Sequence, residues 1–157
     1  METGLLHLHN FTRWLVLIFG VWALYRAATG LGGRRAFTTT DRKASLFLLI
    51  ATHVQLLLGL VLYVTRGWAS QLVNGGSGIM KNKALRFWTV EHGPVMILAV
   101  ALITIGYSAA KRGVTDKAKF NRWFWYTLIG FIIVLATIPW PGRELIGRGL
   151  FPGMSAQ

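Results

Sequence analysis

The chain has 157 residues, a formal net charge of +12 and no cysteine, with 54% hydrophobic but only 14% charged residues. A soluble domain usually carries about 25% charged residues, so this composition indicates a membrane protein, and the lack of cysteine excludes disulfides, thiolate metal sites and covalently attached c-type haem. The positive charge does not indicate a nucleic-acid partner, because the basic residues lie mostly between apolar blocks, where topology signals and lipid headgroup contacts place them.

Four apolar blocks follow one another along the chain, at residues 11–29, 44–65, 87–110 and 123–141. Each is close to the ~20 residues that a helix needs to cross ~30 Å of hydrocarbon. Only helices or closed barrels satisfy the backbone in lipid, and these blocks lack the alternation of barrel strands. The sequence therefore predicts an all-α fold, an integral membrane four-helix up-down bundle over residues 1–141, followed by an interfacial C-terminal tail over residues 142–157.

The connections between the blocks predict the orientation. Ten of the 17 basic residues lie in the first and third connections, and seven lie in the second connection and the terminal regions. By the positive-inside rule the first and third connections lie inside. We therefore expect a multi-pass membrane protein with both termini outside. Asp41, at the end of the first connection, is expected to cap the second helix.

Four histidines are the main candidates for a functional site. His7 and His9 stand directly before the first span, His53 lies near the middle of the second, and His92 lies in the first turns of the third. In an up-down bundle the first and third helices are diagonal and both start from the outer face. His9 and His92 therefore form the natural pair, with a depth mismatch of ~5 Å that a tilt of ~20° absorbs. His53 is expected ~10 Å deeper than His92, and His7 is expected to stay hydrated at the interface.

Two histidines on facing helices can ligate haem b if both rings are neutral and their other nitrogens are held by acceptors. Arg13, one turn after His9, is placed to meet a haem propionate. Thr89 and Glu91 are candidates to orient a ring. Room for a flat macrocycle is expected from glycines in or beside the spans: Gly20, Gly59, Gly93, Gly106 and Gly130.

Structural interpretations of the same residues stay open. Gly93-Pro94 could mark the start of the third helix and leave His92 outside it, and glycines in membrane helices are common packing devices. A histidine in mid-membrane needs a partner, which for His53 could be Thr52, a backbone carbonyl, a quinol or a haem iron. Gln55 lies about 200° around the helix from His53 and so faces another direction.

Several stretches resemble a family of short four-span proteins of Bacteroidota-type bacteria that are commonly labelled cytochrome b. They are HLHNFTRW, THVQLLLGLVLYV, VEHGPVMILAVALITIGYS, KFNRW and IPW, and they cover the chain from about His7 to Trp140. The resemblance implies haem b and marks His7 or His9, His53 and the Glu91-His92 pair. It also implies a multi-pass protein of the bacterial inner membrane, in which termini on the outer side lie in the periplasm. The tail after Trp140 departs from the family pattern, as does the lack of an arginine before IPW.

Three functions remain. The first is a haem b electron-transfer protein, or a cytochrome-type subunit of a respiratory complex between quinol and an external acceptor. The second is a non-haem accessory subunit of a larger membrane complex. The third is a small proton-linked transporter using His53, although the repeats and broken helices typical of transporters are missing. Stand-alone catalysis is not expected, because no nucleophile elbow, metalloprotease motif or paired intramembrane carboxylates occur. The expected partners are membrane lipids, other membrane subunits and a quinone, and no nucleic acid.

Overall fold

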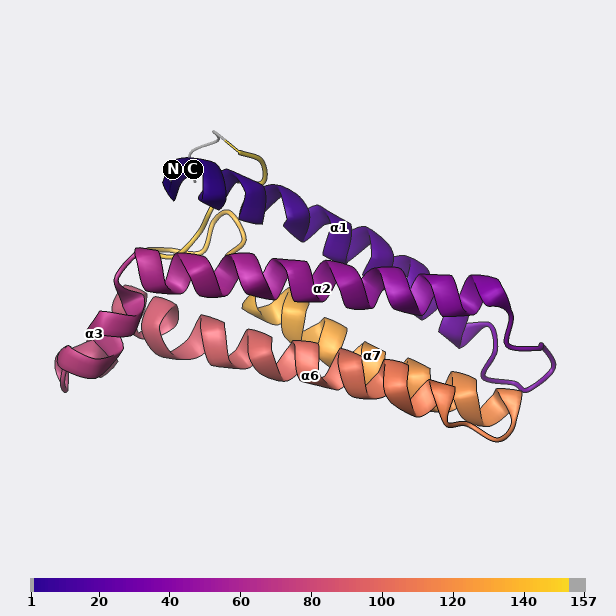
Figure 1. Cartoon of the computed structure of the whole chain (residues 1–157). Helices are drawn as coiled ribbons and strands as arrows, with labels where there is room; N and C mark the ends of the chain where they lie inside the picture. The colour runs from indigo at the N-terminus through magenta and orange to yellow at the C-terminus, as the bar shows by residue number, and fades with distance from the viewer. Residues whose placement is uncertain (1, 153–157) are drawn as a thin grey trace.

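The computed structural model describes residues 2–152, which form an all-helical bundle without strands. Its four long helices are α1 (Glu2–Ala28), α2 (Thr39–Thr65), α6 (His92–Lys111) and α7 (Asp116–Thr137) (Figure 1). Each is long and apolar enough to cross a membrane, α6 together with the turns that precede it. The predicted fold class, a four-helix membrane bundle, is confirmed.

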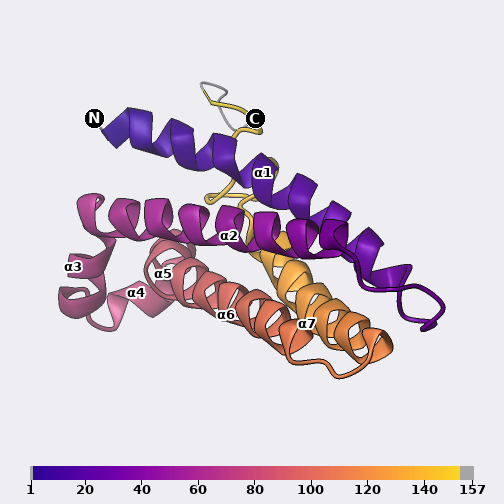
Figure 2. The ribbon, with the colours of Figure 1, turned by 45° about the vertical axis from the view of Figure 1, so that its right-hand side comes forward.

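The packing of the four helices follows the up-down order. α1 packs against α2 and α7, and α6 packs against the same two helices, so α1 and α6 are diagonal. The α1–α2 and α6–α7 loops lie at one end of the bundle (Figure 1). The other end holds three short helices between α2 and α6: α3 (Trp68–Asn74), α4 (Gly78–Lys81) and α5 (Lys83–Arg86) (Figure 2). The start of α1 and the segment after α7 also lie at this end (Figure 1).

Small residues fill much of the interior. Ala23, Ala27, Ala44 and Ala99 are all completely buried. Such residues let helix backbones approach closely, which is how helices associate in lipid, where apolar burial alone gives no driving force between them. Larger side chains, above all Trp123, fill the space near the loop end.

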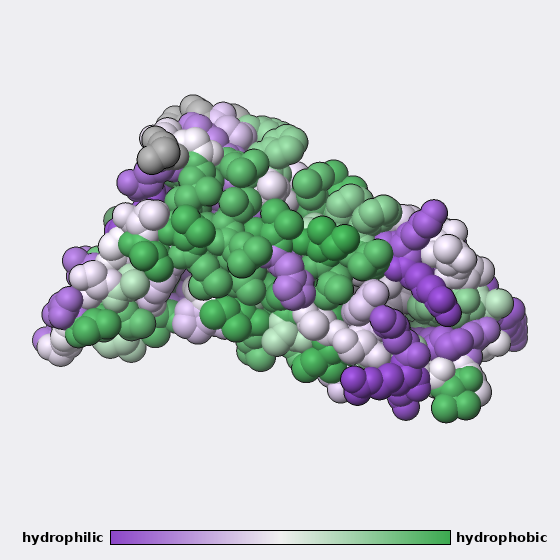
Figure 3. All heavy atoms as spheres, viewed as in Figure 1, coloured by the Kyte–Doolittle hydropathy of each residue, from purple (hydrophilic) through white to green (hydrophobic). Residues whose placement is uncertain are grey.

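The outside of the bundle is hydrophobic over its middle and hydrophilic at the loop end (Figure 3). Large apolar side chains are more than half exposed on every long helix, among them Ile18, Leu57, Leu98 and Ile132. In water so large an apolar surface would be a liability, whereas in a bilayer it faces lipid tails. The exposed surface therefore agrees with the membrane assignment made from the sequence.

The first helix is longer than its apolar block. α1 begins at Glu2 rather than near residue 11, so His9 lies within the helix and not before it. The apolar block corresponds only to the part of the helix that crosses the hydrocarbon. Backbone hydrogen bonds extend the helix through the polar residues that precede this block.

Pro94 does not begin the third long helix. A π-helical turn, η1 (Phe87–Glu91), precedes α6, and the N–H of His92 donates to the carbonyl of Phe87. Proline has no N–H, so Pro94 cannot donate to the carbonyl of Val90, and a wider turn at this point accommodates the missing bond. His92 is therefore inside a continuous helical segment.

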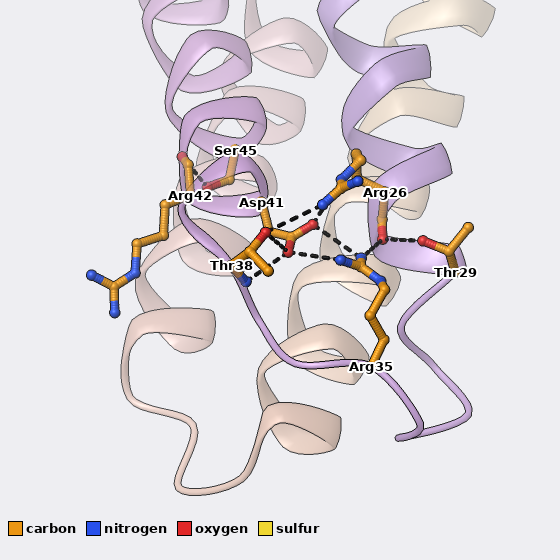
Figure 4. Close-up of polar contacts among 7 residues, drawn as sticks. All are labelled: Arg26, Thr29, Arg35, Thr38, Asp41, Arg42 and Ser45. Atoms are coloured by element: carbon orange, nitrogen blue, oxygen red, sulfur yellow. Dashed lines mark hydrogen bonds and ion pairs between the residues drawn. The ribbon is translucent and has the colours of Figure 1, made fainter.

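A buried carboxylate joins α1 to α2 at the loop end (Figure 4). Asp41 is completely buried and accepts hydrogen bonds from Arg26 Nε at 2.9 Å and Arg35 NH1 at 2.9 Å. It also accepts the backbone N–H of Thr38, the N-cap residue, at 2.8 Å. The expectation that Asp41 caps α2 holds in this form, as the third residue of a capping box.

Candidate functional site

A cavity of about 330 Å³ lies among the helices, and both His9 and His92 line it. Its wall is formed by parts of α1, α2, α3, η1, α6 and α7 and by the segment after α7. Most of the lining side chains are apolar, including Leu56, Met96 and Val134. The structure thus brings the predicted pair together in an apolar setting.

His9 is held on one side of its ring. The side-chain Nε2 of Gln55 lies 3.2 Å from His9 Nε2 and also donates to the backbone carbonyl of His9 at 3.0 Å. Thr12 donates its hydroxyl to the Gln55 Oε1 and so helps to fix the amide. The other ring nitrogen, Nδ1, is buried and has no hydrogen-bond partner within residues 2–152.

His92 is also held on one side of its ring. Its Nδ1 donates to the carbonyl of Thr137 at 3.3 Å, and its ring packs at 5.4 Å from Phe87 and 5.6 Å from Trp88. With the proton on Nδ1, the lone pair of Nε2 is available, and no protein group among the described residues donates to it. The acceptor comes from α7, which the sequence did not suggest.

The two side chains expected to orient His92 have other partners. The hydroxyl of Thr89 donates to the carbonyl of Leu85 at 2.5 Å. Glu91 forms an ion pair with Arg86 at 2.6 Å. The expectation was wrong because Glu91 is adjacent to His92 and so lies about 100° around the helix from it, and because the wider turn η1 rotates Thr89 off the face that residues three apart share in an α-helix.

Three arginines line the cavity: Arg13, Arg66 and Arg148. Within the described part of the chain no aspartate or glutamate lines it. Arg13 was expected here, but its guanidinium NH2 donates to the carbonyls of Leu150 at 2.8 Å and Gly149 at 3.3 Å. Its Nε remains buried without a partner in residues 2–152.

Arg66 and Arg148 were not singled out from the sequence. Burial, and then the nearby charge of Arg66, lower the pKa of the Arg148 guanidinium below its usual value. Arg148 lies over the ring of Trp88 at 4.9 Å, and Arg66 Nε lies 3.0 Å from the half-exposed Glu2. Positively charged side chains that lie close together with few negatively charged partners favour the binding of an anion beside them. Only the charge of these two residues could have drawn attention to them in the sequence. No local sequence pattern indicates that the segment after α7 folds back and brings Arg148 to the cavity.

Of the glycines expected to make room, two line the cavity. A Cβ on Gly59 would lie 3.1 Å from His9 Cε1, and one on Gly93 would lie 3.9 Å from the Tyr63 ring. The others serve helix packing: a Cβ there would meet Phe131 at Gly20, Tyr126 at Gly106 and Ile103 at Gly130.

His53 and His7 lie outside this cavity. His53 is exposed on the outer face of α2, and its Nδ1 donates to the carbonyl of Leu49 at 2.8 Å. The prediction that Gln55 faces another direction is confirmed, since Gln55 lines the cavity. His7 is half-buried in α1, and its Nδ1 has no partner within residues 2–152.

The arrangement fits a ligand that contacts the open nitrogen of each imidazole, which is Nε2 with its lone pair in His92 and the protonated Nδ1 in His9, since the Gln55 amide donates to His9 Nε2. In each of His9 and His92, one nitrogen is held by the protein and the other is left without a protein partner. Among residues 2–152 no group of three or more side chains could hold a bare metal ion. A haem brings four nitrogen ligands of its own and needs only one or two axial side chains, so the residues present fit it better than a bare ion. No protein family, curated protein or solved structure matches the chain.

Proposed function

We propose that the chain is a membrane haem b electron-transfer protein, or the cytochrome-type subunit of a respiratory complex, in which His9 and His92 would hold the haem iron. The observation that carries this proposal is the pair of half-satisfied imidazoles on diagonal helices, facing one apolar cavity. The resemblance of the sequence to short four-span proteins labelled cytochrome b supports it independently. His53 remains on the outer face and is not needed for this ligation.

The surrounding residues have distinct roles in this proposal. Thr137 accepts the Nδ1 proton of His92 and so leaves Nε2 free for iron, as partners of metal-bound histidines commonly do. Gln55 donates to Nε2 of His9, which puts the ring proton on Nδ1, so ligation by His9 would require the Gln55 amide to turn and accept from Nε2 instead. The cationic rim formed by Arg13, Arg66 and Arg148 meets the two propionates. The apolar lining keeps water away and favours a neutral centre. The haem itself would supply reversible one-electron chemistry.

The orientation proposed from the loop charges indicates toward which face of the membrane the site lies. Ten basic residues lie in the α1–α2 and α6–α7 loops or in the helix turns next to them, and we place this end of the bundle on the inner side of the inner membrane, with both termini in the periplasm. The cavity is lined by residues near the opposite end, such as Leu6 and Trp68, so it lies toward the outer face. A quinol in the membrane and an acceptor on a periplasmic subunit are the corresponding redox partners.

The test is a reduced-minus-oxidised visible spectrum of the detergent-purified protein. We expect a b-type α band that is lost in His9→Ala and His92→Ala and kept in His53→Ala, because His53 does not line the cavity. Helical circular dichroism identifies variants that fail to fold. For a variant that folds without haem, added imidazole should restore part of the band.

Two results would overturn the proposal. A colourless, folded wild type that does not take up added haem would leave the non-haem accessory subunit as the better function. A band that depends on His53 and survives the loss of both His9 and His92 would place the haem on the outer face of α2 instead.

A further inference from the structure

A second hollow lies between α6 and α7 and is separate from the histidine cavity. It measures about 530 Å³ and shares no residue with the first. Its lining is formed by Thr104, Ile105, Ser108, Ala109, Arg112, Arg122 and Tyr126, which we call the α6–α7 groove. Arg112 and Arg122 are both exposed at its loop end, whereas Ile105 is exposed nearer the middle of the bundle.

The two arginines of the groove have no carboxylate partner within residues 2–152. The acidic residues near this end are Asp41, which pairs with Arg26 and Arg35, and Asp116, which pairs with Lys119. Arg122 instead donates to the backbone carbonyl of Arg112 at 3.4 Å, which draws the two residues together. Their positive charges are therefore available to an anion from outside the chain.

The groove also changes in polarity along its length. Thr104 and Arg112 are eight residues apart on α6, a rise of about 12 Å. Between these levels lie the hydroxyl groups of Ser108 and Tyr126, and beside them lies the apolar side chain of Ile105. On the face that Figure 3 draws, hydrophilic side chains at the loop end of the bundle adjoin its hydrophobic middle.

We propose that the α6–α7 groove binds one anionic phospholipid. The phosphate meets Arg112 and Arg122, the ester and glycerol oxygens meet Ser108 and Tyr126, and an acyl chain runs along Ile105. Arginine is suited to the phosphate because its guanidinium donates to two oxygens at once. A free anion would satisfy the arginines alone, but only a lipid also covers the apolar part of the groove. The proposal is independent of the haem.

The experiment is native mass spectrometry of the detergent-purified protein after equilibration with phosphatidylglycerol or with phosphatidylcholine. We expect the wild type to retain one phosphatidylglycerol and to retain phosphatidylcholine far less. Arg112→Gln/Arg122→Gln should lower phosphatidylglycerol retention roughly 30-fold, since each of the two basic residues contributes about 1 kcal/mol at an anionic surface. The matched control is Arg34→Gln/Arg42→Gln, which removes the same charge from exposed positions at the same end. Figure 4 shows the Arg42 side chain directed away from the Asp41 network.

Each other outcome counts against the proposal. Equal loss in both double variants would mean that overall charge attracts the lipid and that the groove binds none specifically. Equal retention of the two lipids would remove the role of the phosphate charge. Displacement of the lipid by millimolar inorganic phosphate would assign the arginines to a free anion. Helical circular dichroism of both variants ensures that lost retention reflects binding.

Discussion

At the scale of single residues, Gln55 on α2 contacts the His9 ring of α1. Its amide contacts the ring and the backbone of His9, while Thr12 donates to its oxygen. It carries no charge and lies on a different helix from His9. A substitution of Gln55 can therefore test how the protein holds the His9 ring without removing a proposed haem ligand.

We expect Gln55→Leu to leave the protein folded but to weaken haem binding about 10- to 100-fold, the usual effect of losing a partner that holds a ligating histidine. Leucine has nearly the same volume and simply removes the hydrogen bonds. The measurement is a haem titration of the apoprotein. Gln71→Leu, on the exposed surface of α3, is the matched control and should bind haem as the wild type does. Unchanged affinity in Gln55→Leu would exclude a role for Gln55 in holding the ring.

Asp41 is the residue whose charge matters most for stability. Its carboxylate is completely buried between two guanidinium groups, so Asp41→Asn leaves both arginines without a counter-charge. Removing one partner of a buried ion pair costs about 3–5 kcal/mol. The melting temperature in detergent should fall clearly. Asp116→Asn breaks the exposed pair with Lys119 and should lower the melting temperature far less than Asp41→Asn does. Similar losses in the two variants would contradict this ranking.

The sequence could predict the pairing of His9 with His92 because both lie at the same end of helices that an up-down bundle makes diagonal. It could not predict which groups hold the two rings. Gln55 and Thr137 come from neighbouring helices, and their contact depends on how each helix is rotated about its axis. Arg148 reaches the cavity only because the chain folds back after α7.

At the scale of helices, the close approach of α6 and α7 depends on Gly130. A Cβ at this position would lie 2.9 Å from Ile103 Cγ1 and 3.0 Å from the carbonyl oxygen of Ala99. The carbonyl belongs to the helix backbone and can move only if α6 itself moves. The contact between the two helices therefore requires glycine.

Gly130→Ala should accordingly destabilise the bundle, by about 1–3 kcal/mol, the usual cost of adding a methyl group to a close-packed contact. Thermal unfolding in detergent followed by circular dichroism measures the effect. Gly4→Ala is the control, because nothing lies within 4 Å of a Cβ there. Alanine favours helix more than glycine does, so Gly4→Ala should be neutral or slightly stabilising. A Gly130→Ala variant as stable as the wild type would show that the two helices can separate without cost.

The number and order of the long helices could be predicted from the apolar blocks, because the hydrocarbon thickness fixes their length. Their ends could not. α1 continues through His7 and His9 because helical hydrogen bonding does not require apolar residues. The turn η1 adds a residue to the helix before His92, which rotates the preceding side chains relative to those that follow. Thr89 and Glu91 therefore face away from the ring that they were expected to orient.

At the scale of the whole molecule, the segment after α7 returns to the first half of α1. Arg13 and Trp14 donate to the carbonyl of Leu150 at 2.8 Å and 3.0 Å, and Phe151 stacks on Trp14 at 5.4 Å. The backbone N–H of Arg148 donates to the carbonyl of Pro139 at 2.9 Å. These contacts hold the segment over the cavity, so its removal would open one wall.

We expect Arg13→Gln to release this segment, because the loss of the guanidinium leaves the carbonyls of Gly149 and Leu150 with fewer donors. Trypsin should then cut after Arg148 several-fold faster, which mass spectrometry of the digest measures. Cleavage after Arg34, which is exposed in the α1–α2 loop and lies outside this segment, serves as the internal reference. An unchanged ratio of the two cuts would show that Trp14 and Phe151 hold the segment without Arg13.

Because this segment returns to α1 from the end of the chain, the cavity wall is completed late in the assembly of the protein. A chain inserted from its N-terminus has His9 in the membrane early, yet Ile138, Pro139 and Arg148 complete the cavity wall only after all four helices have been made. Until then the pocket has an open side. A bulky planar ligand could enter through that side during biosynthesis and be retained when the segment docks on Arg13 and Trp14, so loading of the site would coincide with the last step of folding.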